Sequence, residues 1–370
     1  MASALKQLQD TFPPKGDLEF IYFGLTSSCN LKCFYCYDET VRKDRKVENE
    51  LSLEEIEEIV KDCKKLNLKI VNITGGEPFL NPNWYEIGRM FSNIGAEVNY
   101  STNGTLLSKE NIKKLSKIKA GLQISLDGND EMMEWVTKGK MMYSNTIEKI
   151  SFCKEHGVDV LVNSVVGKHN IDFVDQFMDD LHEKEIRCRF TPYNKEFNPR
   201  HSEYALTVQE KYKLIMKVNE YNGKKNTRRI KMTLPPLMTP ENIPLSIQPA
   251  CGWAYNAAGI LPNGDVTVCA PASGIDFFKA GNIRESSFYD IWNNSELFKK
   301  LRAYTPADLK GICADCPVND ICIGSCRVLA YITTKDETAP QPFCQDFYDA
   351  VQSGLIEADS FPMSVVKIEK

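Results

Sequence analysis

Hydrophobic and polar residues alternate in two different rhythms along the first part of the chain. Short apolar runs, typical of buried strands, are each followed by a longer segment whose apolar residues recur every three or four positions, as on one face of a helix. The expected strands are 18–26, 69–74, 97–102, 121–127, 159–166 and 186–193. The expected helices are 52–66, 83–95, 108–118, 144–157, 171–184 and 207–221.

The first of these helices has a clear start signal. Ser52 precedes the apolar stripe and Glu55 follows three residues later, which predicts a capping box. Repeated strand–helix units indicate a parallel sheet with right-handed crossovers. We therefore expect an α/β fold, a partial (β/α)6 barrel, with ligands bound where the strands end, as in complete barrels.

Beyond residue 232 the chain changes character. The stretch 233–249 is rich in proline and is expected to be a connector. Asn263-Gly264 lies between two alternating runs and predicts a β-hairpin. A helix is expected near 286–302, and a last one at Cys344. The expected division is a barrel at 1–232, a connector at 233–250, a cysteine-rich domain at 251–350 and a tail at 351–370.

Composition narrows the class of protein. The 370 residues are 42% hydrophobic and 26% charged, as in soluble globular proteins, and the net charge of −5 gives no basis for a nucleic-acid or membrane surface. No apolar run approaches 18 residues, and the first residues lack the apolar core of a signal peptide. We expect a cytoplasmic protein that binds neither nucleic acid nor membrane.

The thirteen cysteines need an explanation, because thiols in a reducing compartment more often bind metal or react than form disulfides. Cys29, Cys33 and Cys36 lie at C-x3-C-x2-C spacing in TSSCNLKCFYCYDET. Two thiols suit a disulfide and four suit zinc, whereas a four-iron cluster on three thiolates keeps one iron free. The scattered cysteines are expected to be small buried apolar residues: Cys63, Cys153 and Cys188.

A three-cysteine motif just after a first barrel strand resembles that of the radical S-adenosylmethionine (SAM) enzymes. The resemblance implies a [4Fe–4S] cluster on Cys29, Cys33 and Cys36, whose free iron chelates the amino and carboxylate groups of SAM. An electron from the cluster would then cleave SAM to a 5′-deoxyadenosyl radical. For this motif alone, zinc binding or a chance match is the alternative.

The ends of the following strands carry further positions that resemble the family. Gly75 and Gly76 in ITGGEP leave room for close backbone approach, and Glu77 offers an acceptor to an ammonium group. STNG ends the third strand and ISLDG the fourth, while Asn163 and Val165 share one face of the fifth and would border ribose and adenine. The implied SAM-binding residues are Gly75, Gly76, Glu77, Pro78, Ser101, Asn103, Ser125, Asn163 and Val165.

One departure from the family concerns the cofactor carboxylate. The family often has an arginine after the fourth strand, whereas the corresponding stretch here, EWVTKGKMMY (134–143), has none. Lys138 or Lys140 is the expected substitute.

The C-terminal cysteines resemble the seven-cysteine pattern of the SPASM domain, an extension of many radical SAM enzymes that modify peptides or proteins. A zinc ribbon is the alternative, because C-x2-C is also zinc spacing. The resemblance implies two auxiliary [4Fe–4S] clusters. The outer cluster would be held by Cys313, Cys316, Cys322 and Cys344, and the inner one by Cys251, Cys269 and Cys326.

Seven thiols leave the inner cluster one ligand short of the eight that two clusters need. Some relatives have another cysteine shortly after the first, but the stretch after Cys251 reads GWAYNAAG. The open iron would accept either a substrate thiol or a non-cysteine ligand such as water or a side chain, and both remain open. Sulfatase maturases have an acidic base after the cysteine equivalent to Cys269, where this chain has Ala270.

Four functions follow from these residues. The leading one is a thioether or carbon–carbon cross-link in a ribosomally made peptide. The second is peptide oxidation or epimerisation, and an epimerase would use Cys188 as its hydrogen-atom donor. The third is a small-molecule role in haem or quinone-cofactor synthesis. The fourth is a non-catalytic iron–sulfur or zinc protein. The 28 residues before Cys29 are too few for a fused leader-binding module. A separate leader-recognition protein is therefore expected, together with a flavodoxin- or ferredoxin-type electron donor.

Overall fold

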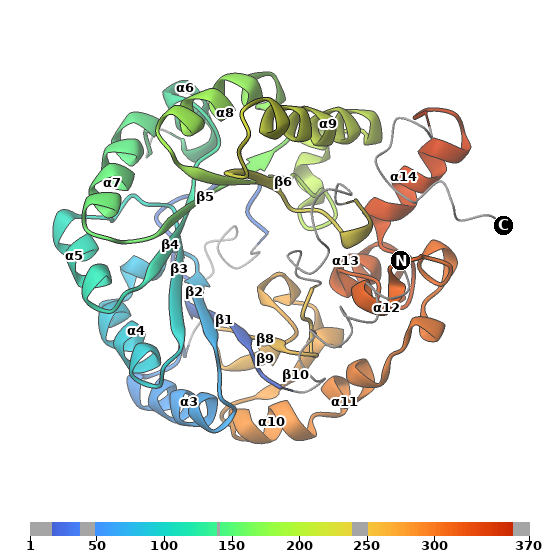
Figure 1. Ribbon diagram of the computed structural model, residues 1–370. Helices are drawn as coiled ribbons and strands as arrows, with labels where there is room; N and C mark the ends of the chain where they lie inside the picture. Colours follow the sequence, from blue (N-terminus) through green and yellow to red (C-terminus); the bar gives the residue numbers. More distant parts are fainter. Residues whose placement is uncertain (1–16, 38–48, 139–140, 239–250, 358–370) are drawn as a thin grey trace.

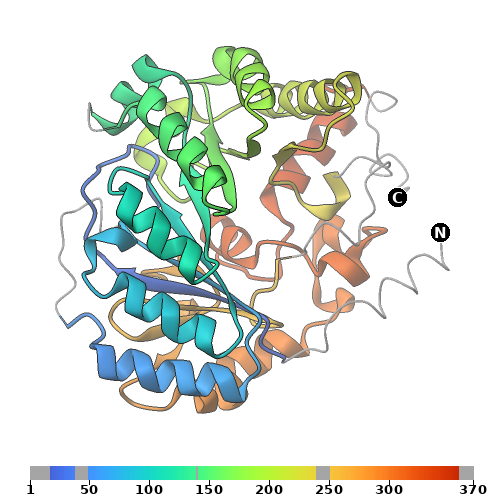
Figure 2. The same cartoon turned by 60° about the vertical axis from the view of Figure 1, so that its left-hand side comes forward.

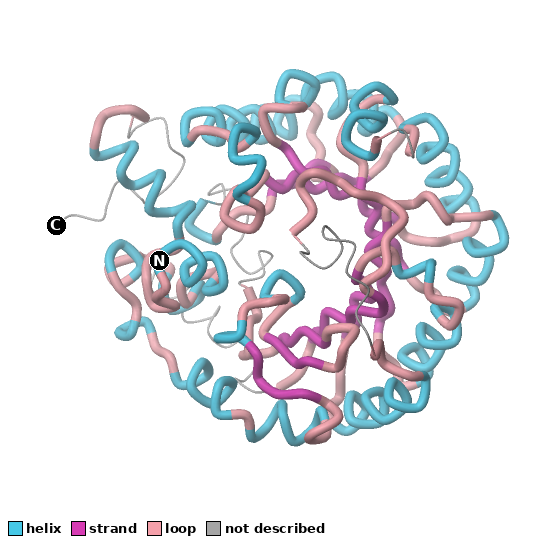
Figure 3. Tube along the Cα trace, turned by 180° about the vertical axis from the view of Figure 1, so that it is seen from behind, coloured by secondary structure: helices cyan, strands magenta, loops and turns pink. Residues whose placement is uncertain are grey.

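The computed structural model describes residues 17–37, 49–138, 141–238 and 251–357. Its described strands form one curved sheet in the order β10-β9-β8-β1-β2-β3-β4-β5-β6-β7 (Figures 1 and 3). Strands β1 to β7 are parallel to one another. The strands are β1 (Phe20–Thr26), β2 (Ile70–Gly75), β3 (Glu97–Thr102), β4 (Gly121–Ser125), β5 (Val160–Val166), β6 (Arg187–Pro192), β7 (Ile230–Met232), β8 (Ala257–Ile260), β9 (Asp265–Thr267) and β10 (Lys279–Asn282).

Helices cover the outer face of this sheet, and the inner face is turned toward the centre of the ring that Figure 1 shows. In Figure 2 several of these helices lie in a row over the strands. The outer helices of the barrel are α3 (Leu53–Lys65), α4 (Trp84–Asn93), α5 (Lys109–Lys117), α6 (Asp130–Thr137), α7 (Tyr143–Glu155), α8 (Val174–Glu183) and α9 (Val208–Lys224). The C-terminal helices are α10 (Phe288–Asn294), α11 (Glu296–Ala303), α12 (Asn319–Cys322), α13 (Arg327–Thr334) and α14 (Pro342–Gln352).

The predicted α/β partial barrel is confirmed, and local sequence explains how its elements form. The Ser52–Glu55 capping box is present at the start of α3, with the Ser52 side chain accepting from the Glu55 N–H. Along β1, Ile21 and Phe23 are fully buried on the helix side, whereas Tyr22 between them is partly exposed. Period-two alternation therefore separates an apolar outer face from a more polar inner face.

The cysteine-rich part of the chain continues the barrel sheet, which the sequence did not indicate. Strand β8 pairs in parallel with β1, and β9 and β10 follow in antiparallel fashion. The predicted hairpin joins β8 to β9, and Gly264 in its loop has a φ of +85° that favours glycine. The barrel and the C-terminal part thus share hydrogen bonds at β1, the strand that leads into the first cysteine motif.

Other differences are local. The segment expected to be one helix near 286–302 is two, α10 and α11, because Ser295 between them has extended backbone. Helix α6 and the short strand β7 were not predicted. Most of the expected connector, residues 239–250, lies outside the described residues, as do 358–370 of the expected tail. Among the helices that are described, none has the length and apolar character needed to cross a bilayer.

Candidate active site

The first cysteine motif lies in the loop that follows β1, and a carboxylate from a distant segment fixes the start of that loop. Glu50 Oε1 accepts hydrogen bonds from Thr26 Oγ1 (3.0 Å), the Ser27 N–H (2.7 Å) and Ser27 Oγ (2.8 Å). Glu50 precedes Leu51, whose N–H donates to the Pro262 carbonyl in the β8–β9 loop. The cysteine loop is therefore tied to the C-terminal hairpin, a contact that sequence reasoning missed.

The glycines of the GGEP turn give the cysteine loop its place. The Gly76 N–H donates to Thr26 O (2.8 Å) and the Glu77 N–H to Ser28 O (2.8 Å). A Cβ added at Gly75 would collide with Thr26 O, and one added at Gly76 would collide with Ser28 O. The predicted close backbone approach is present, and in this structure the backbone that approaches is the loop carrying Cys29.

The Glu77 side chain points into the protein. Its carboxylate is 0% exposed and accepts from Thr102 Oγ1 (2.8 Å), the Asn103 N–H (2.8 Å) and the Phe79 N–H (3.2 Å). Burial raises its pKa, and these three donors oppose that effect. Glu77 thus joins the ends of β2 and β3, and its contact with an ammonium group stays a prediction. Pro78 begins the short helical turn that follows.

Asn103 connects the third strand to the cysteine loop. Its Nδ2 donates to Asn30 Oδ1 (2.9 Å) and lies 4.0 Å from Cys29 Sγ. Asn30 in turn donates to Thr105 Oγ1 (2.8 Å). Ser101 faces inward and donates to Asn72 Oδ1 (3.1 Å) on β2. Asn103 thus lies beside the cysteine loop and Ser101 on the inner face, and their contacts with SAM stay predictions.

Asp127 connects the cysteine loop to β5, and it was not among the predicted site residues. Its carboxylate accepts from Tyr35 Oη (2.5 Å) and the Val165 N–H (2.7 Å), while its backbone carbonyl accepts from Asn170 Nδ2 (3.0 Å). Desolvation raises the pKa of Asp127 to about 6, against the effect of these donors. Its position in ISLDG, directly after β4, was the signal that could have identified it.

The remaining predicted SAM-binding residues lie on adjacent strands. Ser125 is the register partner of Asn163, so both project from the same face of the sheet. Asn163 accepts from Thr191 Oγ1 of β6 (3.2 Å). The Val165 backbone is held by Asp127, which lies one hydrogen bond from Tyr35 of the cysteine motif. Their contacts with SAM remain predictions.

Cys188 is not placed as a barrel-facing hydrogen-atom donor. It is 0% exposed, as is Phe190 two residues later, whose ring lies 6.2 Å from that of Phe177 in α8. Cys188 therefore points toward the helices, and its neighbour Arg189 takes the inner face. The nomination of Cys188 is wrong for that reason. Cys63 and Cys153 are buried in the core, as predicted.

The structure describes only one of the two lysines expected to replace the missing arginine. Lys138 ends α6 with a left-handed backbone conformation (φ 55°). Lys140 lies outside the described residues.

Aromatic packing holds the other side of the cysteine loop. Phe34 contacts Tyr193 and Tyr204, and its carbonyl accepts from Asn198 Nδ2 (2.5 Å). Tyr193 and Trp253 are 3% and 2% exposed, in agreement with core packing.

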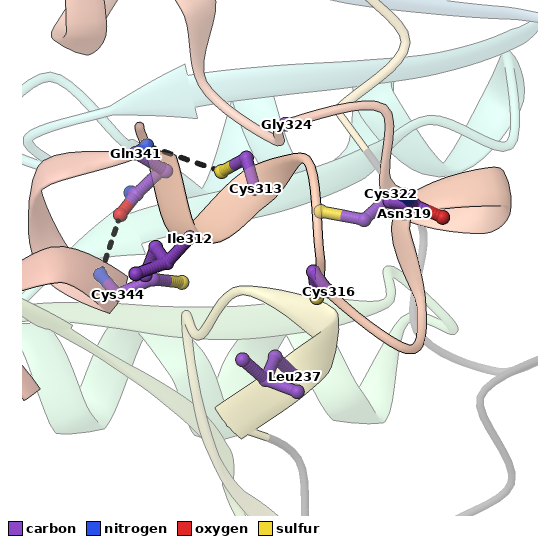
Figure 4. Close-up of a pocket in the computed structure, with 9 residues that line it drawn as sticks. All are labelled: Leu237, Ile312, Cys313, Cys316, Asn319, Cys322, Gly324, Gln341 and Cys344. Atoms are coloured by element: carbon purple, nitrogen blue, oxygen red, sulfur yellow. Dashed lines mark hydrogen bonds between the residues drawn. The ribbon is translucent and has the colours of Figure 1, made fainter. Parts of the chain in front are cut away.

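Four C-terminal cysteines line one small pocket, here called the outer site (Figure 4). Three of them are buried and Cys316 is partly exposed. Gln341 holds two of the four: its N–H donates to Cys313 Sγ (3.5 Å), and its Oε1 accepts from the Cys344 N–H (2.9 Å). The outer site consists of Cys313, Cys316, Cys322 and Cys344, the set that the resemblance implied.

Burial makes the outer thiols hold their protons in the absence of a metal. Desolvation raises the pKa of Cys316 to about 11 and of Cys322 to about 12, and mutual repulsion between the thiolates adds to both shifts. Without a metal these thiols stay protonated, whereas ligation by iron would displace their protons. A crowded, apolar set of four thiols fits a cluster-binding role.

Cys251, Cys269 and Cys326 form a second group, here called the inner site. Electrostatic coupling links Cys269 to both other thiols, and Tyr22 of β1 is coupled to all three. Desolvation raises the pKa of each thiol, to about 12 for Cys251. Yet Cys251 is exposed and the other two are partly exposed. The inner cysteines are thus less buried as residues than those of the outer site.

The sequence and fold are similar to those of known proteins. The model of the radical SAM superfamily matches residues 24–181, and that of the SPASM iron–sulfur cluster-binding domain matches residues 251–317. The chain is a radical SAM enzyme with a SPASM domain. The matched ranges include the cysteine loop after β1 and four of the seven C-terminal cysteines, namely Cys251, Cys269, Cys313 and Cys316. The two domains imply a [4Fe–4S] cluster with SAM and auxiliary iron–sulfur clusters.

Individual relatives fall into two groups. An AdoMet-dependent heme synthase of Methanosarcina barkeri is 28% identical over 88% of this chain and 95% of its own length. The mycofactocin maturase MftC of Mycolicibacterium smegmatis is 27% identical over 88% of this chain and 82% of its own. Streptococcus suis SuiB bound to the precursor peptide SuiA covers 92% of this chain and 77% of SuiB, with a TM-score of 0.71 at 19% identity, and supports the fold.

Proposed function

We propose that this enzyme modifies a peptide substrate by hydrogen-atom abstraction, and that the product is a thioether or carbon–carbon cross-link in a ribosomally made peptide. The observation that carries the proposal is the inner site. Its three cysteines are exposed or partly exposed residues, whereas the outer site gathers four cysteines, three of them buried, around one pocket. When bound, the cluster on Cys29, Cys33 and Cys36 supplies the electron that cleaves SAM to the 5′-deoxyadenosyl radical.

The chain's own residues hold that chemistry in place. Gly75 and Gly76 seat the cysteine loop against β2, and Asn103 approaches Cys29 Sγ. Tyr35 and Asp127 join the loop to β4 and β5. The predicted SAM contacts then run along the same strand ends, from the GGEP turn through Asn103 and Ser125 to Asn163 and Val165.

We assign one auxiliary [4Fe–4S] cluster to the outer site and one to the inner site. Four thiolates complete the ligand set of the outer cluster, which suits it to electron transfer. Three thiolates leave one iron of the inner cluster for another ligand. A substrate thiol held there would lose its proton under the charge of the metal, and the cluster would accept the one electron released when a substrate carbon radical forms the C–S bond.

A small-molecule substrate from haem or quinone-cofactor synthesis is the second candidate. It rests on the 28% identity to the Methanosarcina barkeri heme synthase, which slightly exceeds that to the peptide maturase. Other peptide oxidations have less support: Ala270 stands where a sulfatase-maturase base would be, and epimerisation loses its nominated donor because Cys188 faces the helices.

Two partners and a location belong to the proposal. A peptide route calls for a separate leader-recognition protein, or for a substrate that needs no leader. Reduction of the cluster calls for a flavodoxin- or ferredoxin-type electron donor. We assign the enzyme to the cytoplasm, where thirteen free thiols stay reduced.

Co-expression with short peptides encoded beside the gene, followed by mass spectrometry, tests the function. Loss of two hydrogens per event supports cross-linking or oxidation, and thiol alkylation then separates thioether from carbon–carbon products. Unchanged mass with deuterium taken up from heavy water identifies epimerisation. No change in any peptide, beside turnover of a porphyrin carboxylate, transfers the function to the small-molecule class. A Cys29→Ala variant is the negative control.

A further inference from the structure

We propose that Arg189 and Lys231 form a carboxylate-binding site for the substrate on the inner face of the barrel. The inference rests on the proposed function, because it names a chemical group that the substrate of that site must carry. It starts from the register of two neighbouring strands: Arg189 of β6 is the pairing partner of Lys231 of β7. Side chains at paired positions of parallel strands project from the same face.

That face is the inner one. Cys188 and Phe190, on either side of Arg189, are 0% exposed and packed toward α8. Ile230, beside Lys231, is 1% exposed and belongs to the same core. Arg189 and Lys231 therefore project away from the helices, and both are exposed. Two cations lie side by side on a surface that faces the centre of the barrel.

Within the described parts of the chain, neither cation has a hydrogen bond or an ion pair. Arg187, two residues earlier on the same face, shows the contrast: its Nη2 lies 2.5 Å from each carboxylate oxygen of Asp159. Asn163, the register partner of Arg189, is neutral, and so are Thr191 and Thr233, because amide and hydroxyl side chains carry no charge. Thr191 hydrogen-bonds to both of the others. Paired cations without an acidic partner, next to neutral hydrogen-bonding groups, suit a ligand that brings the negative charge.

The position of the pair favours the substrate over SAM as the source of the carboxylate. The methionine end of SAM is expected at the GGEP turn, at the end of β2, beside Cys29. Arg189 lies in the middle of β6, four strands further along the sheet. A carboxylate on Arg189 and Lys231 would thus lie on the inner face of the barrel, away from the GGEP turn.

Calorimetric titration of the reconstituted enzyme tests the site with glutarate as the probe and with glutaramide, its uncharged counterpart. We expect glutarate to bind, glutaramide not to bind, and the Arg189→Met/Lys231→Met double variant to lose glutarate affinity by about tenfold or more, the loss expected for charge-assisted hydrogen bonds. Arg187→Met, on the same strand and face, is the matched control and keeps the affinity. Equal glutarate binding by the double variant, or no binding by the wild type, overturns the proposal.

Two further measurements separate the sources of the carboxylate. SAM affinity and substrate-free formation of 5′-deoxyadenosine should be unchanged in the double variant, and a loss of either would assign the pair to SAM and overturn the substrate site. For a peptide found by co-expression, converting its carboxylates to methyl esters should slow the wild type and leave the double variant unaffected. Because the glutarate titration uses no peptide, its result is independent of whether the enzyme proves to be a peptide maturase.

Discussion

The outer and inner sites use the same side chain and differ in enclosure. The outer site brings four cysteines around one pocket, with three of them buried and Gln341 bonded to two. The inner site has three cysteines, all at least partly exposed. They belong to the segment whose strand β8 pairs with β1, the strand that leads into the cysteine loop. A closed ligand set suits electron transfer, whereas an open one suits binding and oxidation of a substrate. The site that lacks a fourth thiol is therefore also the more exposed one, where a substrate could reach a bound cluster.

The largest expected effect comes from removing the three thiols of the cysteine motif after β1. Replacing Cys29, Cys33 and Cys36 by alanine should abolish 5′-deoxyadenosine formation and leave about two thirds of the iron, since both auxiliary sites are built by other residues. Iron analysis and chromatography of the reduced enzyme with SAM check this. Wild-type SAM cleavage by the triple variant would contradict the assignment of the radical site to this loop.

The second prediction closes the inner site. Ala257 of β8 is the register partner of Phe20 on the inner face of β1, and a Cβ on Gly252, next to Cys251, would lie 3.2 Å from the Ala257 Cβ. An Ala257→Cys variant should therefore supply the eighth thiolate. If the open iron is used, product formation should fall by about tenfold or more, because the substrate must now displace a thiolate.

Ala258→Cys is the matched control, since residue 258 is 0% exposed and faces the other side of the strand. Electron paramagnetic resonance of the inner cluster, with and without a cysteine-containing substrate, is the independent readout. The substrate should change the signal of the wild type and of Ala258→Cys, and should leave that of Ala257→Cys unchanged. Unimpaired turnover by Ala257→Cys, with a closed inner cluster, would show that the open position serves no substrate.

The third prediction concerns Arg327, which lies between the two sites. It follows Cys326 of the inner site and is 1% exposed; its Nη2 donates to the carbonyl of Gly324, which lines the outer pocket. Its Nη1 donates to Glu337 O (3.0 Å) and Ala339 O (2.7 Å). Within the described residues its hydrogen bonds go only to carbonyl groups, so thiolates of both sites are expected to balance its buried charge. In line with this, its charge partly offsets the burial that raises the pKa of Cys251, Cys322 and Cys344.

Removing this charge should make both auxiliary clusters harder to reduce. Arg327→Met is expected to shift both midpoint potentials to more negative values, Arg327→Lys to shift them less, and the exposed-site control Lys299→Met to leave them in place. A spectroscopically monitored redox titration measures all three, with iron content as the check on assembly. Unchanged potentials in a fully loaded Arg327→Met variant would show that Arg327 serves packing alone.

The sequence was most informative where the signal is local. The capping box at Ser52 and the strand ends at GGEP depend on residues a few positions apart, and both were predicted. The cysteine groups were also foreseen, through spacing and resemblance. Long-range pairing was not: nothing near Phe20 indicates that β1 pairs with Ala257 of β8, because parallel register depends on the whole fold.

Two errors had different causes. The misplacement of Cys188 was avoidable, because the alternation Arg187, Cys188, Arg189 already puts the thiol opposite two charged side chains. The role of Glu50 could not have been predicted, because its carboxylate reaches Ser27 from a segment that follows undescribed residues and carries no motif. Period-two patterns therefore predict faces of strands well, and they do not predict which loop a polar side chain will hold.

The smallest expected effect tests how firmly the outer site is held together. Asp336 accepts from Lys310 Nζ (2.6 Å), the Thr338 N–H (2.9 Å) and Thr338 Oγ1 (2.6 Å), which links the segment before Cys313 to the segment before Cys344. These donors lower its pKa to about 2, below the value of about 3.9 for an unfolded chain. A carboxyl with a lowered folded pKa stabilises the protein above the unfolded pKa, and this contribution is lost as pH falls toward the folded value. Because the Asp336 side chain is 34% exposed, we expect Asp336→Asn to cost less than about 1 kcal/mol at pH 7 and progressively less below about pH 4. Thermal unfolding of the wild type, Asp336→Asn and the exposed-site control Asp276→Asn across this pH range measures the difference. A penalty that stays constant with pH would show that the turn geometry, and not the charge, holds the outer site together.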